Sequence, residues 1–160
     1  EKEVNEVEYI DQNNYKEYIG KTIKVTGDVY LIGLGLTKIP INFTEVGGSF
    51  DCGRNKLTSL EGVPKEVGGY FDCSWNQLTS LEGAPRKVGG SFYCDNNELT
   101  SLEGSPEKVR DIFNCFNCSY NKLTSLKGSP KEVCGSFYCS DNPLKSFEGK
   151  PEFIGGEFIY

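Results

Sequence analysis

The feature of this sequence that most constrains its fold is a unit that recurs along most of the chain. Its most regular part is the hexapeptide Leu-Thr-Ser-Leu-Glu-Gly, whose first leucine lies at positions 57, 78 and 99 and, in altered copies, at 123 and 144. The steps between copies are therefore 21, 21, 24 and 21 residues. A fixed period of this size is the signature of a repeat architecture, in which each unit stacks on the next.

Other residue types keep the same steps in columns of their own, and such agreement excludes chance. These columns are Asn55, Asn76, Asn97, Asn121 and Asn142; Cys52, Cys73, Cys94, Cys118 and Cys139; Phe50, Phe71, Phe92, Phe116 and Phe137; and Pro64, Pro85, Pro106, Pro130 and Pro151.

Each unit predicts one coil of a solenoid, built around a short strand. In Phe71-Asp72-Cys73 the alternation of apolar and polar residues points Phe71 and Cys73 inward and Asp72 outward. Asn76 follows, where its amide can satisfy backbone groups as the chain leaves the strand. The two leucines of the hexapeptide turn inward on the return path. Since one coil cannot bury its apolar face alone, neighbouring coils must stack.

The run Phe71-x-Cys73-x-x-Asn76-x-Leu78 resembles the strand-and-asparagine segment of the leucine-rich-repeat family. The period and the cysteine column are similar to those of bacterial cysteine-ladder repeats. The sequence of the unit resembles that of short repeat proteins of large tailed bacteriophages. The resemblance implies a leucine-rich-repeat solenoid with stacked short parallel strands on one face and irregular or extended return segments on the other. Gly68, where the family usually has leucine, and Phe or Cys in place of strand leucines leave the curvature open.

The solenoid is expected to span residues 21–160 in about six coils, and residues 1–20 lie outside the repeat. We predict a short N-terminal helical cap there, because Tyr15, Tyr18 and Ile19 would share one helical face and Gly20 would end the helix. Terminal coils need such a cap to keep their apolar interior from water.

The 24-residue step reflects a three-residue insertion near 111–117, where the triplet Phe-Asn-Cys is doubled. We expect a bulge that breaks the strand ladder. Two interpretations stay open: a tolerated surface loop, or a local insertion on a binding face.

The composition argues against an enzyme. The chain has no His, which removes the commonest general base and excludes Ser-His-Asp and Cys-His catalysis. Cys115-x-x-Cys118 is a single CxxC pair, whereas a zinc site normally needs four ligands. The repeated glutamates, such as Glu61 and Glu82, share their column with Lys127 and indicate a solvated stripe. We therefore expect no cofactor, no metal and no catalytic residues.

Charge and cysteine usage bear on partners and location. A net charge of −6 disfavours nucleic acid, because nucleic-acid affinity rests largely on Lys and Arg neutralising phosphates. No apolar run reaches the ~20 residues that cross a bilayer, and the N-terminus shows no signal-peptide pattern. A column of free thiols suits a reducing cytoplasm, here that of a bacterial host if the chain is phage-encoded.

The outward strand positions provide the candidate binding site. They combine tyrosines, the only tryptophan and an arginine with acidic residues, which is the composition of interface hot spots. The alternative is that strand surfaces favour aromatics in any case, some of which pair across neighbouring strands. The candidate partner-binding residues are Tyr30, Asp51, Arg54, Tyr70, Asp72, Trp75, Tyr93, Asn96, Asn117, Tyr120 and Tyr138.

The leading hypothesis is a non-enzymatic protein-binding scaffold. If the phage resemblance holds, its partner is a host protein of a defence or regulatory system, which the chain inhibits. An alternative is a structural or assembly role, with homodimers formed through an unpaired C-terminal strand edge bearing Phe158, Ile159 and Tyr160. A further alternative is a carbohydrate-binding module that uses the outward tyrosines as stacking platforms.

Overall fold

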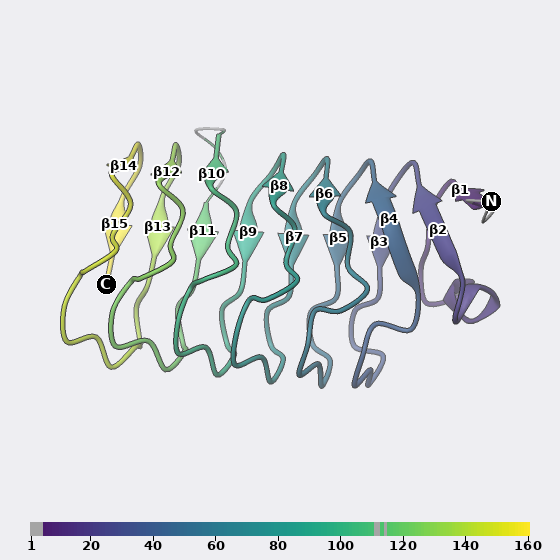
Figure 1. Ribbon diagram of the computed structural model, residues 1–160, viewed down its shortest axis with the longest axis horizontal. Coiled ribbons are helices and arrows are strands. Elements are labelled where there is room, and N and C mark those ends of the chain that lie inside the picture. Colours follow the sequence, from purple (N-terminus) through teal and green to yellow (C-terminus); the bar gives the residue numbers. More distant parts are fainter. Residues whose placement is uncertain (1–4, 111–112, 114) are drawn as a thin grey trace.

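The computed structural model describes residues 5–110, 113 and 115–160, which form an elongated parallel β-solenoid (Figure 1). Each regular turn carries two short strands, one in each of two ladders that run along the molecule. The predicted solenoid of stacked strands is therefore confirmed. Its assignment to the leucine-rich-repeat type rests on the sequence resemblance alone.

The first ladder contains the predicted strands at the Phe-x-Cys segments. Seven parallel strands pair in the order β15-β13-β11-β9-β7-β5-β3, each Phe beside the Phe of the next turn. Their bounds are β3 (Val29–Tyr30), β5 (Phe50–Asp51), β7 (Phe71–Asp72), β9 (Phe92–Tyr93), β11 (Phe116–Asn117), β13 (Phe137–Tyr138) and β15 (Phe158–Ile159).

A second ladder lies on the return path, for which irregular or extended segments were predicted. Most of its strands end in a buried valine that follows a charged residue, as in Glu66-Val67 and Lys87-Val88. It consists of β1 (Asn5–Val7), β2 (Thr22–Val25), β4 (Asn42–Val46), β6 (Glu66–Val67) and β8 (Lys87–Val88), and, after an interruption, β10 (Lys108–Val109), β12 (Glu132–Val133) and β14 (Phe153–Ile154). The Leu-Thr-Ser-Leu segments themselves contain no strand.

The predicted N-terminal helical cap is not confirmed over the described residues 5–20. β1 pairs in parallel with β2, and Ile10 bridges to Val29, so this segment adds another stacked turn. Its one helical element is the short 3-10 helix η1 (Tyr15–Tyr18). Ahead of η1 the backbone N–H groups of Asp11 and Asn13 bond to the side chains of Asn14 and Asp11, and the segment ends at Gly20, which has a φ of +78°. Residues 1–4 lie outside the described part.

The core is a continuous stack of identical layers. The phenylalanine rings from Phe50 to Phe158 stack with successive centroid distances of 5.8, 5.3, 5.2, 5.3 and 5.9 Å. The column cysteines are buried beside them as free thiols. Burial raises the pKa of Cys73 well above its ordinary value, and its Sγ donates a weak hydrogen bond to the Tyr93 carbonyl at 3.4 Å. The thiols therefore act as small apolar groups, as the sequence predicted.

The asparagine column ties each turn to the one before it, which confirms the predicted role of its amides. The Asn76 Nδ2 donates to the carbonyls of Cys52 and Cys73 at 3.1 Å and of Ser74 at 3.3 Å. Its Oδ1 accepts the N–H of Leu57 at 2.9 Å. One buried side chain thus satisfies four backbone groups that strand pairing leaves over.

Replacing Asn76 with Ala should therefore lower the free energy of unfolding by roughly 2–4 kcal/mol, because buried backbone groups lose their partners. Urea denaturation measures this loss. Asn142→Ala is the matched control: Asn142 makes the same contacts in a less buried turn, so its loss should be smaller. Equal losses would contradict the role of burial.

The corner that follows each second-ladder strand is closely packed against the corner of the preceding turn. A Cβ placed on Gly68 would lie 2.0 Å from the Gly47 carbonyl oxygen, and one on Gly89 would lie 2.1 Å from that of Gly68. Only glycine fits such a contact. Two residues depart from this column, Arg110 in the turn with the insertion and Cys134 in the turn stacked upon it.

Gly68→Ala should destabilise the protein by at least about 2 kcal/mol, since a Cβ cannot enter without separating two turns. The control is Cys134→Ala, at the same place in a turn that already accommodates a Cβ, where we expect little change. Thermal unfolding of both variants distinguishes them. A tolerated Gly68→Ala would show that the corner can widen at low cost.

The insertion affects the two ladders differently. In the first ladder Phe116 pairs in register with both Phe92 and Phe137, so the predicted break is wrong there. In the second ladder the pairing stops between β8 and β10, so a break occurs on that side. Residues 111, 112 and 114 of the predicted insertion lie outside the described part, while Phe113 is exposed.

Candidate functional site

The outward face of the first ladder presents the candidate partner-binding residues along the length of the solenoid. Tyr30, Arg54, Trp75 and Tyr120 are exposed. The half-buried members are Tyr70, Asp72, Tyr93, Asn96, Asn117 and Tyr138. Asp51 is buried and lies beneath Tyr70, so it is much less accessible than its outward position suggested.

One column on this face has an unusual backbone. Its members, one in each of five turns, have φ of 55–56° although none is glycine. They are Arg54, Trp75, Asn96, Tyr120 and Asp141. The left-handed conformation costs a non-glycine residue about 1–2 kcal/mol. Trp75 and Tyr120 are nevertheless 52% and 55% exposed, so packing does not repay this cost.

Side chains on the face contact one another between turns. The Arg54 guanidinium lies over the Trp75 ring, 5.4 Å from its centroid. The rings of Tyr70 and Tyr93 meet edge to face with centroids 6.3 Å apart. The Tyr70 hydroxyl donates to Asp51 Oδ2 at 3.4 Å. Three successive turns are therefore joined into one aromatic surface in the middle of the molecule.

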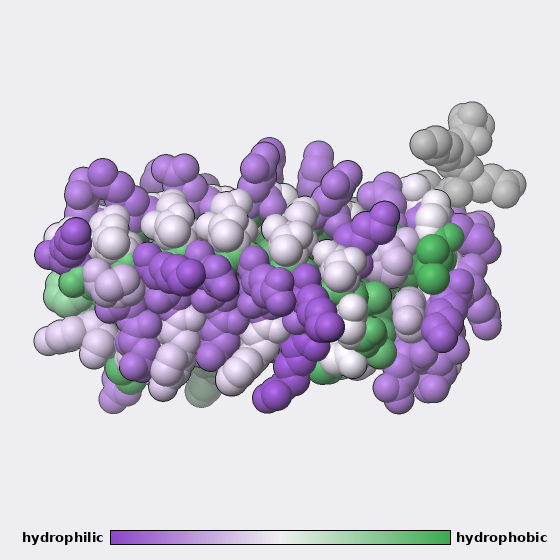
Figure 2. All heavy atoms as spheres, turned by 90° about the horizontal axis from the view of Figure 1, so that it is seen from below, coloured by the Kyte–Doolittle hydropathy of each residue, from purple (hydrophilic) through white to green (hydrophobic). Residues whose placement is uncertain are grey.

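The charges of this face are strongly asymmetric. Among its described outward residues Arg54 is the one cation. The acidic residues are Asp28, Asp51, Asp72, Asp95, Asp141 and Glu157. The lower edge in Figure 1, where the chain passes from the first ladder to the second, is mostly hydrophilic with small separate apolar patches (Figure 2). On the first-ladder face, therefore, aromatic side chains stand beside acidic ones with a single cation among the described outward residues.

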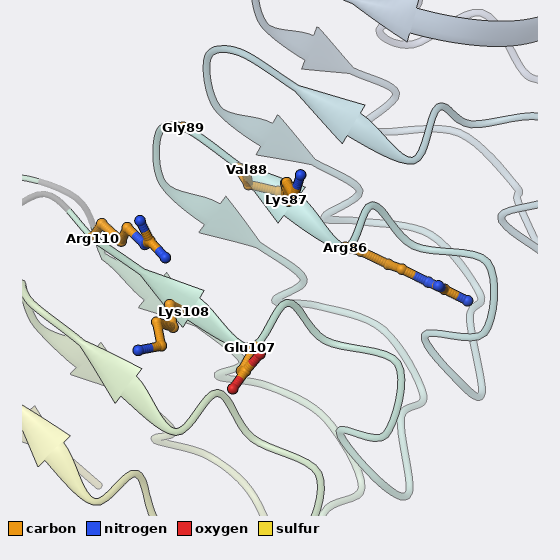
Figure 3. Close-up of a pocket in the computed structure, with 7 residues that line it drawn as sticks. All are labelled: Arg86, Lys87, Val88, Gly89, Glu107, Lys108 and Arg110. Atoms are coloured by element: carbon orange, nitrogen blue, oxygen red, sulfur yellow. The ribbon is translucent and has the colours of Figure 1, made fainter.

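A groove on the second ladder was not anticipated. It encloses 530 Å³ between β8 and β10 and is lined by Arg86, Lys87, Val88, Gly89, Glu107, Lys108 and Arg110 (Figure 3). In regular turns the corner residue donates its N–H to the valine carbonyl of the preceding turn, as Gly89 does to Val67 at 2.9 Å. The corresponding bond from Arg110 to Val88 is absent. Arg110 in a glycine column was the signal in the sequence.

The C-terminal edge is partly closed by its own side chains. The rings of Phe147, Phe158 and Tyr160 contact one another at centroid distances of 4.9–5.4 Å. Lys150 Nζ lies 4.1 Å from the Phe158 centroid. Ile159 is half-buried, and Tyr160 is 72% exposed. Of the three predicted edge residues, Tyr160 is therefore the most accessible.

The cysteines of the CxxC pair have different environments. Cys118 is buried in the core column, whereas Cys115 is half-buried and follows the insertion. Within the described ranges, no three His, Cys, Asp or Glu residues are grouped so as to hold a metal ion.

Comparisons with protein-family models, curated proteins and solved structures found no match. None of the helical structure in the described residues is long and apolar enough to span a membrane.

Burial raises the pKa of Asp51 to about 6, despite a hydrogen bond from the Gly53 N–H. Because this value exceeds that of the unfolded chain, the free energy of unfolding falls as the pH rises from about 4 to about 6, and the loss is complete above that range. Asp51→Asn should therefore add about 1 kcal/mol at pH 7.5, and the gain should largely vanish at pH 4.5. Urea unfolding at both pH values tests this.

Asn is compatible with this position, because Asn117 stands there in a later turn and accepts the Ser119 N–H at 3.0 Å. The control is Asp141→Asn on the exposed part of the same face, for which we expect little change. A gain for Asp51→Asn that was equal at both pH values would contradict the assignment.

Proposed function

We propose that this chain is a non-enzymatic protein-binding scaffold whose contact surface is the outward face of the first ladder. The observation that carries the proposal is the left-handed column, where exposed Trp75 and Tyr120 occupy a conformation that glycine would adopt without cost. Strained backbone conformations whose cost is not offset by side-chain packing are concentrated at functional sites.

The arrangement of the face supports recognition of a protein. The inward columns repeat Phe, Cys and Asn, whereas the outward residues differ from turn to turn. A stacked scaffold therefore holds a non-repeating surface rigidly in place. Large aromatic side chains on such a scaffold lose little entropy on binding, which makes them effective anchors. The surplus of acidic residues favours a partner whose contact surface is basic.

The wider assignment follows from the sequence resemblance. We propose a leucine-rich-repeat-like protein, encoded by a tailed bacteriophage and acting in the cytoplasm of the bacterial host. Its partner would be a host protein of a defence or regulatory system, and occupation of that partner's basic surface would inhibit it.

The double variant Trp75→Gly and Tyr120→Gly separates binding from folding. Relief of the left-handed strain offsets the lost contact between Arg54 and Trp75, so stability should stay within about 1 kcal/mol of the unmodified protein. Capture of the partner from host lysate should fall at least about tenfold, because two anchors are removed. Quantitative mass spectrometry and thermal unfolding measure the two effects.

Asp141→Gly is the control, because it relieves the same backbone strain without removing an aromatic side chain; it should retain capture. A double variant that was stable and bound the partner as well as the unmodified protein would overturn the proposal.

Self-association through the C-terminal edge is the second candidate, favoured by the exposed Tyr160 beside β15. Sedimentation equilibrium tests it: a monomer at all concentrations would exclude it, and a dimer lost in Tyr160→Ser would support it. Retention on glycan arrays would instead favour carbohydrate binding.

A further inference from the structure

We propose that the groove between β8 and β10 is an anion-binding site that holds a phosphate or carboxylate group, with Arg110 as its principal ligand. The site lies on the second ladder and does not depend on the proposed protein-binding face.

The first argument is the structural cost of Arg110. In the corner column, glycine allows each turn to rest on the carbonyl of the preceding one, and a Cβ at Gly89 would lie only 2.1 Å from the Gly68 oxygen. Arg110 stands in the next turn of this column and lacks the bond to Val88 that the regular turns form. A residue that breaks a local packing rule without a structural gain points to a function for its side chain.

The second argument is the charge of the groove. Four cationic side chains and one carboxylate, Glu107, line it in a protein with a net charge of −6. The Glu107 carboxylate lies 3.8 Å from the ammonium of Lys131. Since Lys87 and Lys108 are paired with Glu66 and Glu132, the cations that line the groove without an ion pair among the described residues are Arg86 and Arg110.

The four cations differ in whether they already form an ion pair with a carboxylate. Lys87 forms an ion pair with Glu66 at 2.9 Å and Lys108 one with Glu132 at 3.0 Å. The Lys87–Glu66 pair is exposed and the Lys108–Glu132 pair is half-buried. Their partners lie on β6 and β12, so each ammonium group is held on the side of its strand that faces away from the groove. Neither arginine forms an ion pair with a residue in the described ranges. Arg110 reaches toward β8, whereas Arg86 extends away from it (Figure 3).

The third argument is the set of donors. The Arg110 backbone N–H does not take part in strand pairing, because it forms no hydrogen bond with the Val88 carbonyl, the acceptor that the regular turns predict for it. A guanidinium fork and a backbone N–H are donors that bind oxyanions. Phosphate and carboxylate both fit this chemistry.

The test is a titration of the full chain with inorganic phosphate at fixed ionic strength, followed by amide NMR. Saturable shifts should occur at Lys87–Gly89 and Lys108–Arg110. Arg110→Gln keeps a long side chain at this corner and should weaken binding about tenfold or more. Arg110→Lys should retain more binding than Arg110→Gln. Arg54→Gln removes the same charge from the other ladder and should have no effect.

Two peptides then identify the source of the anion. Binding of a phosphoserine peptide but not of its glutamate counterpart supports a phosphate ligand, and binding of both supports carboxylates as well. The proposal is overturned if phosphate causes no saturable shift, or if Arg110→Gln binds as tightly as the unmodified protein. It is also overturned if duplex DNA binds and Arg54→Gln weakens that binding as much as Arg110→Gln does, since this indicates non-specific polyanion attraction.

Discussion

The distance between successive turns is the constraint on which the rest of this structure depends. Parallel strands pair at about 4.8 Å, and every other contact between turns must fit this spacing. The buried asparagines satisfy the carbonyls and N–H groups that strand pairing leaves over. The glycine corners let the backbones meet where a single Cβ would collide. Phenylalanine rings and small thiols then fill the interior of each layer.

This spacing also explains why the outside can vary while the inside cannot. An inward residue contacts the equivalent residues of the preceding and the following turn, so a substitution in one turn affects the packing of three turns. An outward side chain such as Trp75 meets a neighbour on one side and solvent on the other. The left-handed column shows the consequence, because the scaffold holds Arg, Trp, Asn, Tyr and Asp in the same conformation. Rigid presentation of unlike side chains is what a recognition surface requires.

The turn with the insertion shows how the two ladders can be uncoupled. The first ladder continues through this turn in register, because Phe116 occupies the strand position that pairs with Phe92 on one side and Phe137 on the other. The second ladder opens where Arg110 stands in a glycine column, and the groove results. One side of the solenoid thus keeps a continuous surface while the other acquires a separate basic site.

The sequence by itself determined the repeat, the inward Phe, Cys and Asn columns, and the strand at each Phe-x-Cys segment, because periodic spacing reports directly which residues share a face. It could not determine the second ladder, since Glu66-Val67 is too short to show a strand period. Nor could it show that the N-terminal segment forms a stacked turn through β1 and Ile10, with its helical part limited to the short 3-10 helix η1 (Tyr15–Tyr18). Tertiary structure also decided that Asp51 lies buried beneath Tyr70 and that a groove lies beside Arg110, because both depend on contacts between turns that are distant in sequence.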